Sequence, residues 1–320
     1  MLILLSSASN SAQAEQTDRS LTILAGLPES AHGSAGFISR LPEFLGPAIS
    51  ARIRLSYNPA SGGVMAANRL SLAHPDGTML GALPLSAVVT RTIEDRTPYV
   101  LSDFEPVLLA WSAPYALVAP PSAPFQNLAQ MIELNKRNPE NRALTFYHDG
   151  LNPISPGTLQ TLAVTKKSGL KLNLTQRAGL TPALLVGSEP NVFMAWPLDQ
   201  LAPESKQYKI VAVLADTYRG PCAPDGLDLS SQKLHPSPVH DYLGFYFPSR
   251  TIQAETMNMA KALTALAANP QIETVAENYC LIRGQMDPAQ TAATLNREYI
   301  AQVELLASIY AGENLGQKAP

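Results

Sequence analysis

Short apolar runs alternate with segments of helical periodicity over the first hundred residues of the chain. Residues 21–25 form one apolar run, and residues 53–57 alternate in the manner of a β-strand. Between these runs, apolar side chains recur at the spacing of an α-helix: Phe37, Ile38, Leu41, Phe44 and Leu45. Pro42 lies inside this segment and is expected to bend or interrupt the helix.

A second helix follows and carries Met65, Leu70 and Leu72. It ends at the turn Pro75-Asp76-Gly77, which leads into a strand over residues 78–83. The order strand, helix, strand, helix, strand predicts an α/β fold with a parallel sheet and right-handed crossovers.

The chain changes character near residue 120. Residues 115–119 are predicted to form a strand, and the Pro-rich segment 120–124 that follows is interpreted as the crossing into a second domain. The elements predicted beyond it are helices over 128–136 and 158–167 and strands over 143–147, 210–214 and 243–247. Helices then continue to the end, with breaks at Asn269-Pro270 and over 284–288. A chain of 320 residues is long enough for two such domains.

Two glycine-containing loops, His32-Gly33-Ser34 and Ser61-Gly62-Gly63, follow the first two predicted strands. In a parallel sheet both loops lie at the carboxyl edge, where ligands bind. Each loop opens a helix, whose first backbone N–H groups lack partners and stand at the positive end of the helix dipole. The pair therefore predicts a site for a carboxylate. The alternative at each loop is structural: a tight turn for close packing at Gly62-Gly63 and a simple N-cap at Ser34.

Composition narrows the function classes. Charged residues make up 15% and apolar residues 46% of the chain, as in a compact globular protein, and the net charge is −3. Since no basic run interrupts the sequence, nucleic-acid binding is not expected. The five histidines are scattered without metal-ligand spacing, so neither a metal nor another cofactor is expected.

The N-terminus and the two cysteines bear on the compartment. Residues 1–14 resemble the end of a signal peptide, with a small-x-small cleavage site after Ala14, although a positive leading segment is missing. Export to the periplasm would permit a disulfide between Cys222 and Cys280, and two unpaired thiols are the alternative.

Three motifs together resemble a known family. Gly62-Gly63 and Pro75-Asp76-Gly77 are separated by the eleven residues 64–74, followed by Asp103-Phe104-Glu105-Pro106-Val107 and by Gly179-x-x-Pro182-Ala183-Leu184-Leu185. In this order and at this spacing they resemble the extracytoplasmic solute receptors of tripartite tricarboxylate transporters, the Bug-type binding proteins. The first loop departs from the family pattern, with His32 in place of a glycine and Gly36 in place of an aspartate.

The resemblance implies a two-lobed, Venus-flytrap fold with two crossings. The first lobe would comprise residues 20–119 and 244–320 and the second residues 120–243, with hinges near Pro120 and Leu243. Such a protein is a monomer that closes around a small organic carboxylate, held mainly by backbone amides, and delivers it to membrane permease subunits.

The resemblance also implies which side chains face the cleft. The expected ligand-binding residues are His32, Gly33, Ser34, Ser61, Gly62, Gly63 and Ser86 in the first lobe and Asp149, Gly150, Ser155, Gly179 and Thr181 in the second.

Two other functions stay open. The closed receptor would dock on a membrane sensor kinase if it served signalling instead of transport. A serine hydrolase is a third possibility, because His32-Gly33-Ser34-Ala35-Gly36 is one glycine short of the Gly-x-Ser-x-Gly elbow, with His148 or His240 as base.

Overall fold

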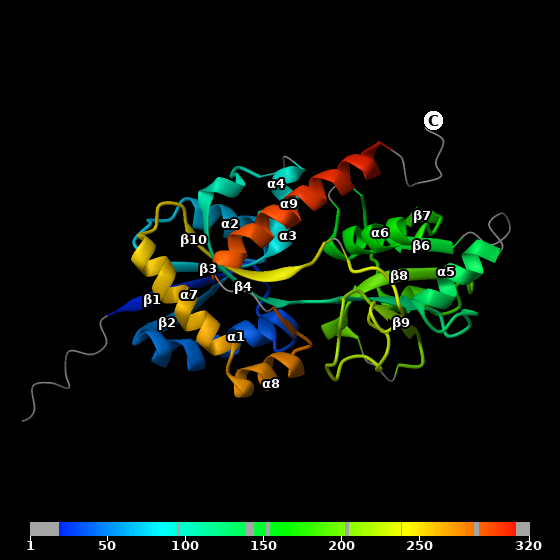
Figure 1. Ribbon diagram of the computed structural model, residues 1–320, viewed down its shortest axis with the longest axis horizontal. Coiled ribbons are helices and arrows are strands. Elements are labelled where there is room, and N and C mark those ends of the chain that lie inside the picture. The colour runs from blue at the N-terminus through cyan, green and yellow to red at the C-terminus, as the bar shows by residue number, and fades with distance from the viewer. Residues whose placement is uncertain are drawn as a thin grey trace, which may run out of the picture.

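A computed structural model shows an elongated molecule built on two β-sheets that lie side by side (Figure 1). The structure describes residues 19–94, 97–137, 144–151, 154–201, 205–237, 239–284 and 288–311. The expected signal peptide, residues 1–14, lies outside this range. Within the described part of the chain, no helix combines the length and the apolar character needed to cross a membrane.

The first lobe is built on a six-stranded sheet with the order β11-β4-β10-β3-β1-β2. Its strands are β1 (Ser20–Ala25), β2 (Arg52–Tyr57), β3 (Met79–Pro84), β4 (Phe104–Ser112), β10 (Tyr242–Pro248) and β11 (Ile282–Arg283). β1 pairs in parallel with β2 and β3, as the sequence predicts, whereas β10 pairs antiparallel with β3 and β4.

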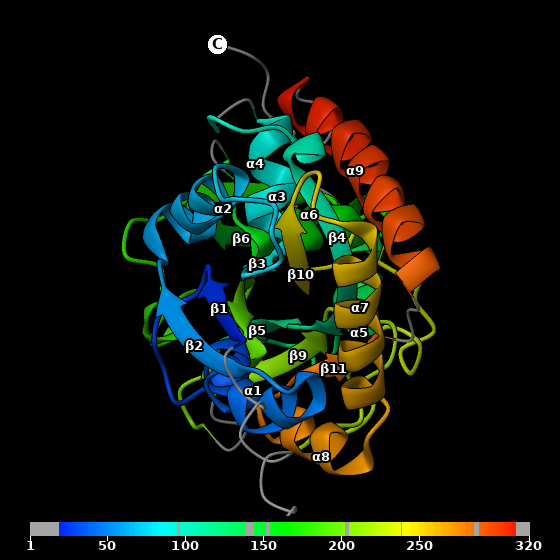
Figure 2. The same ribbon diagram turned by 90° about the vertical axis from the view of Figure 1, so that its left-hand side faces the viewer.

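Helices cover both faces of this sheet (Figure 2). One face packs on α1 (Gly33–Ile49), α7 (Gln253–Ala267) and α8 (Pro270–Asn278). The other packs on α2 (Val64–Ser71), which follows the 3₁₀ turn η1 (Ala60–Gly63), and on α3 (Leu85–Val88). The short elements α4 (Thr90–Ile93) and η2 (Leu101–Asp103) lead from α3 into β4. Neighbouring residues of β1 divide between the faces, since Ile23 belongs to the first core and Leu24 to the second.

Pro42 was expected to bend or to interrupt the first helix, and the interruption is wrong, because α1 runs through Pro42 and Pro47 to Ile49. A proline inside a helix costs about 3 kcal/mol. The apolar face of α1 offsets this cost, because Phe37, Ile38 and Leu41 are completely buried against the sheet.

The second lobe is built on a five-stranded sheet with the order β7-β6-β8-β5-β9. Its strands are β5 (Tyr115–Ala119), β6 (Leu144–His148), β7 (Leu172–Gln176), β8 (Val192–Pro197) and β9 (Lys209–Val213). Its helical elements are α5 (Leu128–Arg137), α6 (Pro156–Ser168), η3 (Pro182–Leu185) and η4 (Leu198–Gln200).

The chain passes between the sheets at two places. It leaves the first sheet after Ser112 and enters β5 at Tyr115, so the expected crossing at Pro120 lies one strand beyond the point at which the chain changes sheets. It returns just before β10, which begins at Tyr242. The return segment carries His240 and Asp241.

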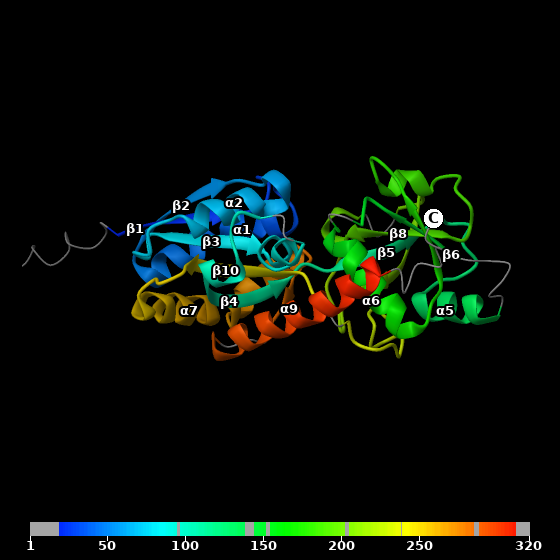
Figure 3. The ribbon, with the colours of Figure 1, turned by 90° about the horizontal axis from the view of Figure 1, so that it is seen from above.

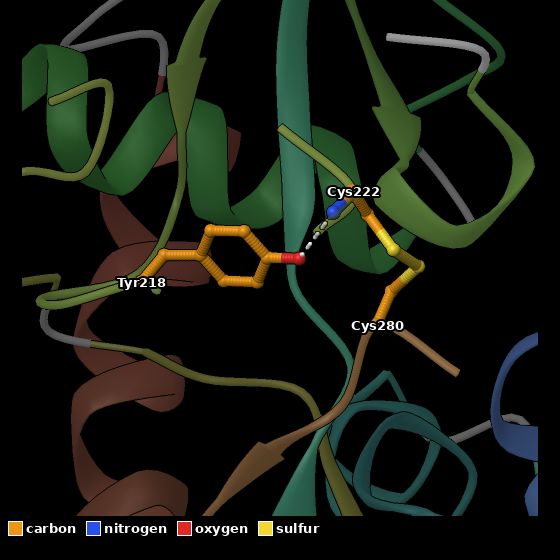
Figure 4. The surroundings of a disulfide bond; sticks show 3 residues. All are labelled: Tyr218, Cys222 and Cys280. Atoms are coloured by element: carbon orange, nitrogen blue, oxygen red, sulfur yellow. Dashed lines mark hydrogen bonds between the residues drawn. A yellow bond between two sulfur atoms is a disulfide. The ribbon is translucent and has the colours of Figure 1, made fainter. Parts of the chain in front are cut away.

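Two further links join the lobes. The last helix, α9 (Pro288–Tyr310), runs along both lobes (Figure 3): Leu295 packs in the core of the first lobe, whereas Leu305 and Ile309 pack in that of the second. Residues 288–310 therefore do not belong to the first lobe alone. Cys222, in the segment between β9 and β10, forms a disulfide with Cys280, which follows α8 (Figure 4).

Candidate ligand-binding cleft

A cavity of about 640 Å³ lies between the lobes, a volume typical of small-molecule sites. Its walls come from the loop after β1, from both crossings and from the end of β8: Leu27, Pro28, Ser30, His32, Ser34, Ala35, Pro84, Ala113, Pro114, Tyr115, Pro197, Asp199, Gln200, Leu201, Asp241, Tyr242 and Leu243. β1 and β3 are parallel, so the loops that follow them reach the same edge of the first sheet. Residues of both lobes and of both crossings therefore line the same cavity.

The first predicted loop lies in this wall. His32 is the N-cap of α1, and both His32 and Ser34 line the cavity. Gly33 has a φ of +56°, a backbone conformation that favours glycine. The start of α1 therefore lies in the wall of the space between the lobes.

A carboxylate of the second lobe lies against the same helix start. A Cβ atom placed on Gly33 would come within 1.6 Å of Oδ2 of Asp199, so this oxygen packs directly on the glycine. Burial raises the pKa of Asp199, while nearby His32 acts in the opposite direction. Asp199 was not among the residues predicted from the sequence, although it follows β8, which is parallel to β6.

The contact between Gly33 and Asp199 yields a test of how the lobes meet. We expect Gly33→Ala to lower the free energy of unfolding by about 1–2 kcal/mol through its positive φ alone, with a further loss from the clash with Asp199. Asp199→Ala should relieve only the second part. Urea denaturation of both single variants and the double variant should therefore give a coupling energy of at least about 0.5 kcal/mol. Strictly additive effects would contradict the contact.

The second predicted loop lies apart from the cavity wall. Ser61, Gly62 and Gly63 all have positive φ, and Ser61 and Gly62 are exposed. A Cβ atom on Gly63 would lie 2.8 Å from the carbonyl oxygen of Gly26. Gly63 therefore permits the close packing of η1 against the end of β1, which is the structural alternative considered for this loop.

The remaining predicted residues do not line the main cavity either. Ser155 is the N-cap of α6, and its hydroxyl donates to Oδ1 of Asp149 at 2.8 Å. This carboxylate also accepts a bond from the Thr158 hydroxyl at 3.3 Å, so it serves the start of α6. The positions outside the cavity wall are Asp149, Gly150, Ser155, Gly179, Thr181 and Ser86, the last of which lines a smaller adjoining recess.

The described structure does not bring either histidine of the hydrolase hypothesis into the cavity wall that contains Ser34. His240 binds Glu298 through Nδ1 at 2.8 Å, and its Nε2 lies 3.8 Å from Asp216. His148 is buried and stacks on Phe146.

Asp241 is the second carboxylate in the cleft that the sequence did not reveal. It is 9% exposed, and within the described structure its Oδ1 atom is buried without a hydrogen-bond partner. Burial raises its pKa to about 7, opposed by a hydrogen bond from the Ser86 backbone. Burial holds the pKa of the Tyr115 hydroxyl well above its ordinary value, and the nearby negative charges of Asp241 and Asp199 raise this pKa further.

Comparison with known proteins agrees with this architecture. The model of a family described as "Tripartite tricarboxylate transporter family receptor" matches residues 49–303. The chain belongs to this receptor family. The resemblance inferred from the sequence motifs is thereby confirmed.

Solved structures share the fold. A TctC solute-binding protein from Polaromonas, solved without ligand, is 15% identical with a TM-score of 0.69, over 91% of this chain and 99% of the other. MatC from Rhodopseudomonas palustris with bound malate is 19% identical with a TM-score of 0.65, over 90% and 99%. The R. palustris protein Rpa4515 with adipate is 16% identical with a TM-score of 0.68, over 92% and 98%. These likenesses establish the two-lobed periplasmic-binding-protein fold of this receptor.

One curated relative matches a shorter stretch. The "UPF0065 protein in tcbD-tcbE intergenic region" of Pseudomonas sp. (strain P51) is 30% identical over 104 residues. That stretch is 32% of this chain and 30% of the relative.

Proposed function

We propose that this receptor is a periplasmic monomer that captures a small organic carboxylate between its lobes and delivers it to the permease subunits of a tripartite tricarboxylate transporter. The observation that carries the proposal is the 640 Å³ cavity between the lobes, with the start of α1 in its wall. Proteins of the same fold hold malate and adipate, which are small carboxylates. The proposed role is binding and delivery, not catalysis.

Capture would use the interactions that the cleft offers. The hydroxyl groups of Ser30 and Ser34 and the imidazole of His32, beside the start of α1, are suited to a carboxylate, and each charge-assisted bond contributes roughly 1.5–3 kcal/mol. Several such bonds, with water excluded as the lobes close, would support micromolar affinity, which corresponds to about −8 kcal/mol. The two crossings, before Tyr115 and before Tyr242, are the proposed hinges.

A ligand screen tests this function. We expect one class in a panel of small carboxylates, with and without amino groups, to raise the melting temperature of the exported protein, beginning at Glu15. At a ligand concentration about 1,000 times the dissociation constant, the stabilisation is about 4 kcal/mol. Small-angle scattering with the same ligand should show compaction. A flat response from folded protein across the whole panel would contradict the proposed function.

A further inference from the structure

Two carboxylates enter the cleft from different segments of the chain. Asp199 comes from the second lobe, at the end of β8, and Asp241 comes from the return crossing. The wall contains neither lysine nor arginine among the residues that the structure describes there, and His32 is its one basic side chain. With both carboxylates ionised, the cleft carries a negative charge and favours a ligand with a positive group.

The Asp241 carboxylate accepts a hydrogen bond from the Ser86 backbone, and its other oxygen is left without a donor among the described residues. Its side chain is about nine-tenths buried, and its Oδ1 atom has no hydrogen-bond partner in the described part of the molecule. A buried carboxylate oxygen without a donor is costly, so such atoms in proteins are usually bonded to protein, water or ligand. Because Asp241 lines the cavity, a donor that enters the cleft comes to lie beside this carboxylate.

Asp199 already occupies the place that suits a ligand carboxylate. Its Oδ2 atom packs on Gly33 at the positive end of α1, where a helix favours an anion. A second carboxylate at this point would meet Asp199 as a like charge, whereas a cation beside Asp199 would be attracted to it.

We propose that the ligand of this receptor carries a protonated amine, which binds between Asp199 and Asp241, so that its substrates are amino acids and not plain di- or tricarboxylates. The inference rests on the proposed function, which supplies the ligand carboxylate. Ser30, His32 and Ser34 line the same wall and provide hydroxyl and imidazole groups for that carboxylate. Tyr115 lines the cavity together with both aspartates.

Matched pairs of acids isolate the amine. The probes are succinate and aspartate, glutarate and glutamate, and adipate and 2-aminoadipate, with 1,4-diaminobutane as an amine without a carboxylate. Isothermal titration of the exported protein should show at least one amino acid binding 100-fold or more tightly than its unsubstituted partner. Equal or tighter binding of the plain acids would overturn the inference and leave the proposed function standing.

The remaining outcomes separate the two proposals. Binding of the diamine alone would support the amine site while contradicting the proposed carboxylate receptor. A folded protein that binds no probe would overturn both.

Substitutions locate the amine site. Asp241→Asn and Asp199→Asn keep the shape of each side chain and remove its charge. Each variant should bind the preferred amino acid at least 10-fold more weakly. Its affinity for the matching acid without the amine should change much less. Asp225→Asn makes the same charge change at an exposed position outside the cavity wall and should leave both affinities unchanged. Circular dichroism confirms that each variant is folded. If both Asn variants keep the full preference for the amino acid, the assignment to these carboxylates is wrong.

Discussion

Replacing Cys222 and Cys280 by serine is expected to lower the free energy of unfolding by about 4 kcal/mol. The disulfide closes a loop between residues 58 positions apart, and the chain-entropy relation for a loop of this length gives a value of that size. Much of a typical domain's stability, about 5–15 kcal/mol, would therefore depend on one covalent bond. Urea denaturation of the oxidised protein and the double variant measures the difference.

The controls for this prediction use the same chain. The wild-type protein unfolded in the presence of a reducing agent should match the double serine variant, since both lack the same bond. A difference below about 1 kcal/mol would show that the reduced, unfolded chain is already restricted by other means.

The place of this bond gives the prediction a second readout. Cys222 belongs to the second lobe, where its N–H donates to the Tyr218 hydroxyl at 3.1 Å, while Cys280 follows α8 of the first lobe (Figure 4). The bond therefore limits how far the lobes separate. Small-angle scattering of the ligand-free serine variant should show a larger radius of gyration than that of the oxidised protein.

Sequence patterns predicted the elements of the first lobe because their causes are local. Alternation over 53–57 and apolar spacing from Phe37 to Leu45 identify β2 and α1 directly. The interruption expected as one alternative at Pro42 does not occur, because the effect of this proline depends on the burial of the whole helix face, which tertiary packing decides. The residues of β5 were predicted, but its lobe was misjudged, since membership of a sheet depends on partners distant in the sequence, here β8 and β9.

The candidate site was predicted in part for the same reason. The loop His32-Gly33-Ser34 opens a helix after a strand, a local signal, and His32 and Ser34 line the cavity. Asp199 and Asp241 carry no local motif and gain their role because the two lobes bring them to one space. The rule that ligands bind beyond strand ends, applied to β8, offered a signal for Asp199.

Glu298→Ala is expected to lower the free energy of unfolding by about 3–5 kcal/mol, as the loss of one partner from a buried charge pair does. Glu298, on α9, is 6% exposed at its side chain and accepts from the His240 backbone at 3.1 Å as well as binding its ring. Burial alone would lower the pKa of His240, but hydrogen bonds to Asp216 and Glu298 outweigh it and raise the pKa to about 9. His240 is therefore a cation that ties the return crossing to both α9 and the second lobe.

The raised pKa of His240 fixes the direction of a pH dependence. The pKa of His240 is 6.5 in the unfolded chain and about 9 in the folded protein. The stabilisation from its charge is therefore fully present below pH 6.5 and is lost as the pH rises through about 9. Three other charged groups lie near this pair: Asp216, Lys167 and Asp241. The hydrogen bond to His240 lowers the pKa of Asp216, and Asp241 ionises near pH 7.

The decline in stability above about pH 8 should therefore come mainly from His240, because Asp241, with a pKa of about 7, is largely ionised by then. Urea denaturation from pH 6 to 10 should show this decline in the wild type and much less of it in Glu298→Gln, which keeps the shape of the side chain and loses its charge. Glu304→Gln, an exposed position on the same helix, should behave like the wild type. If Glu298→Gln retains the full decline, Glu298 does not hold the charge of His240, and α9 stabilises the return crossing by packing alone.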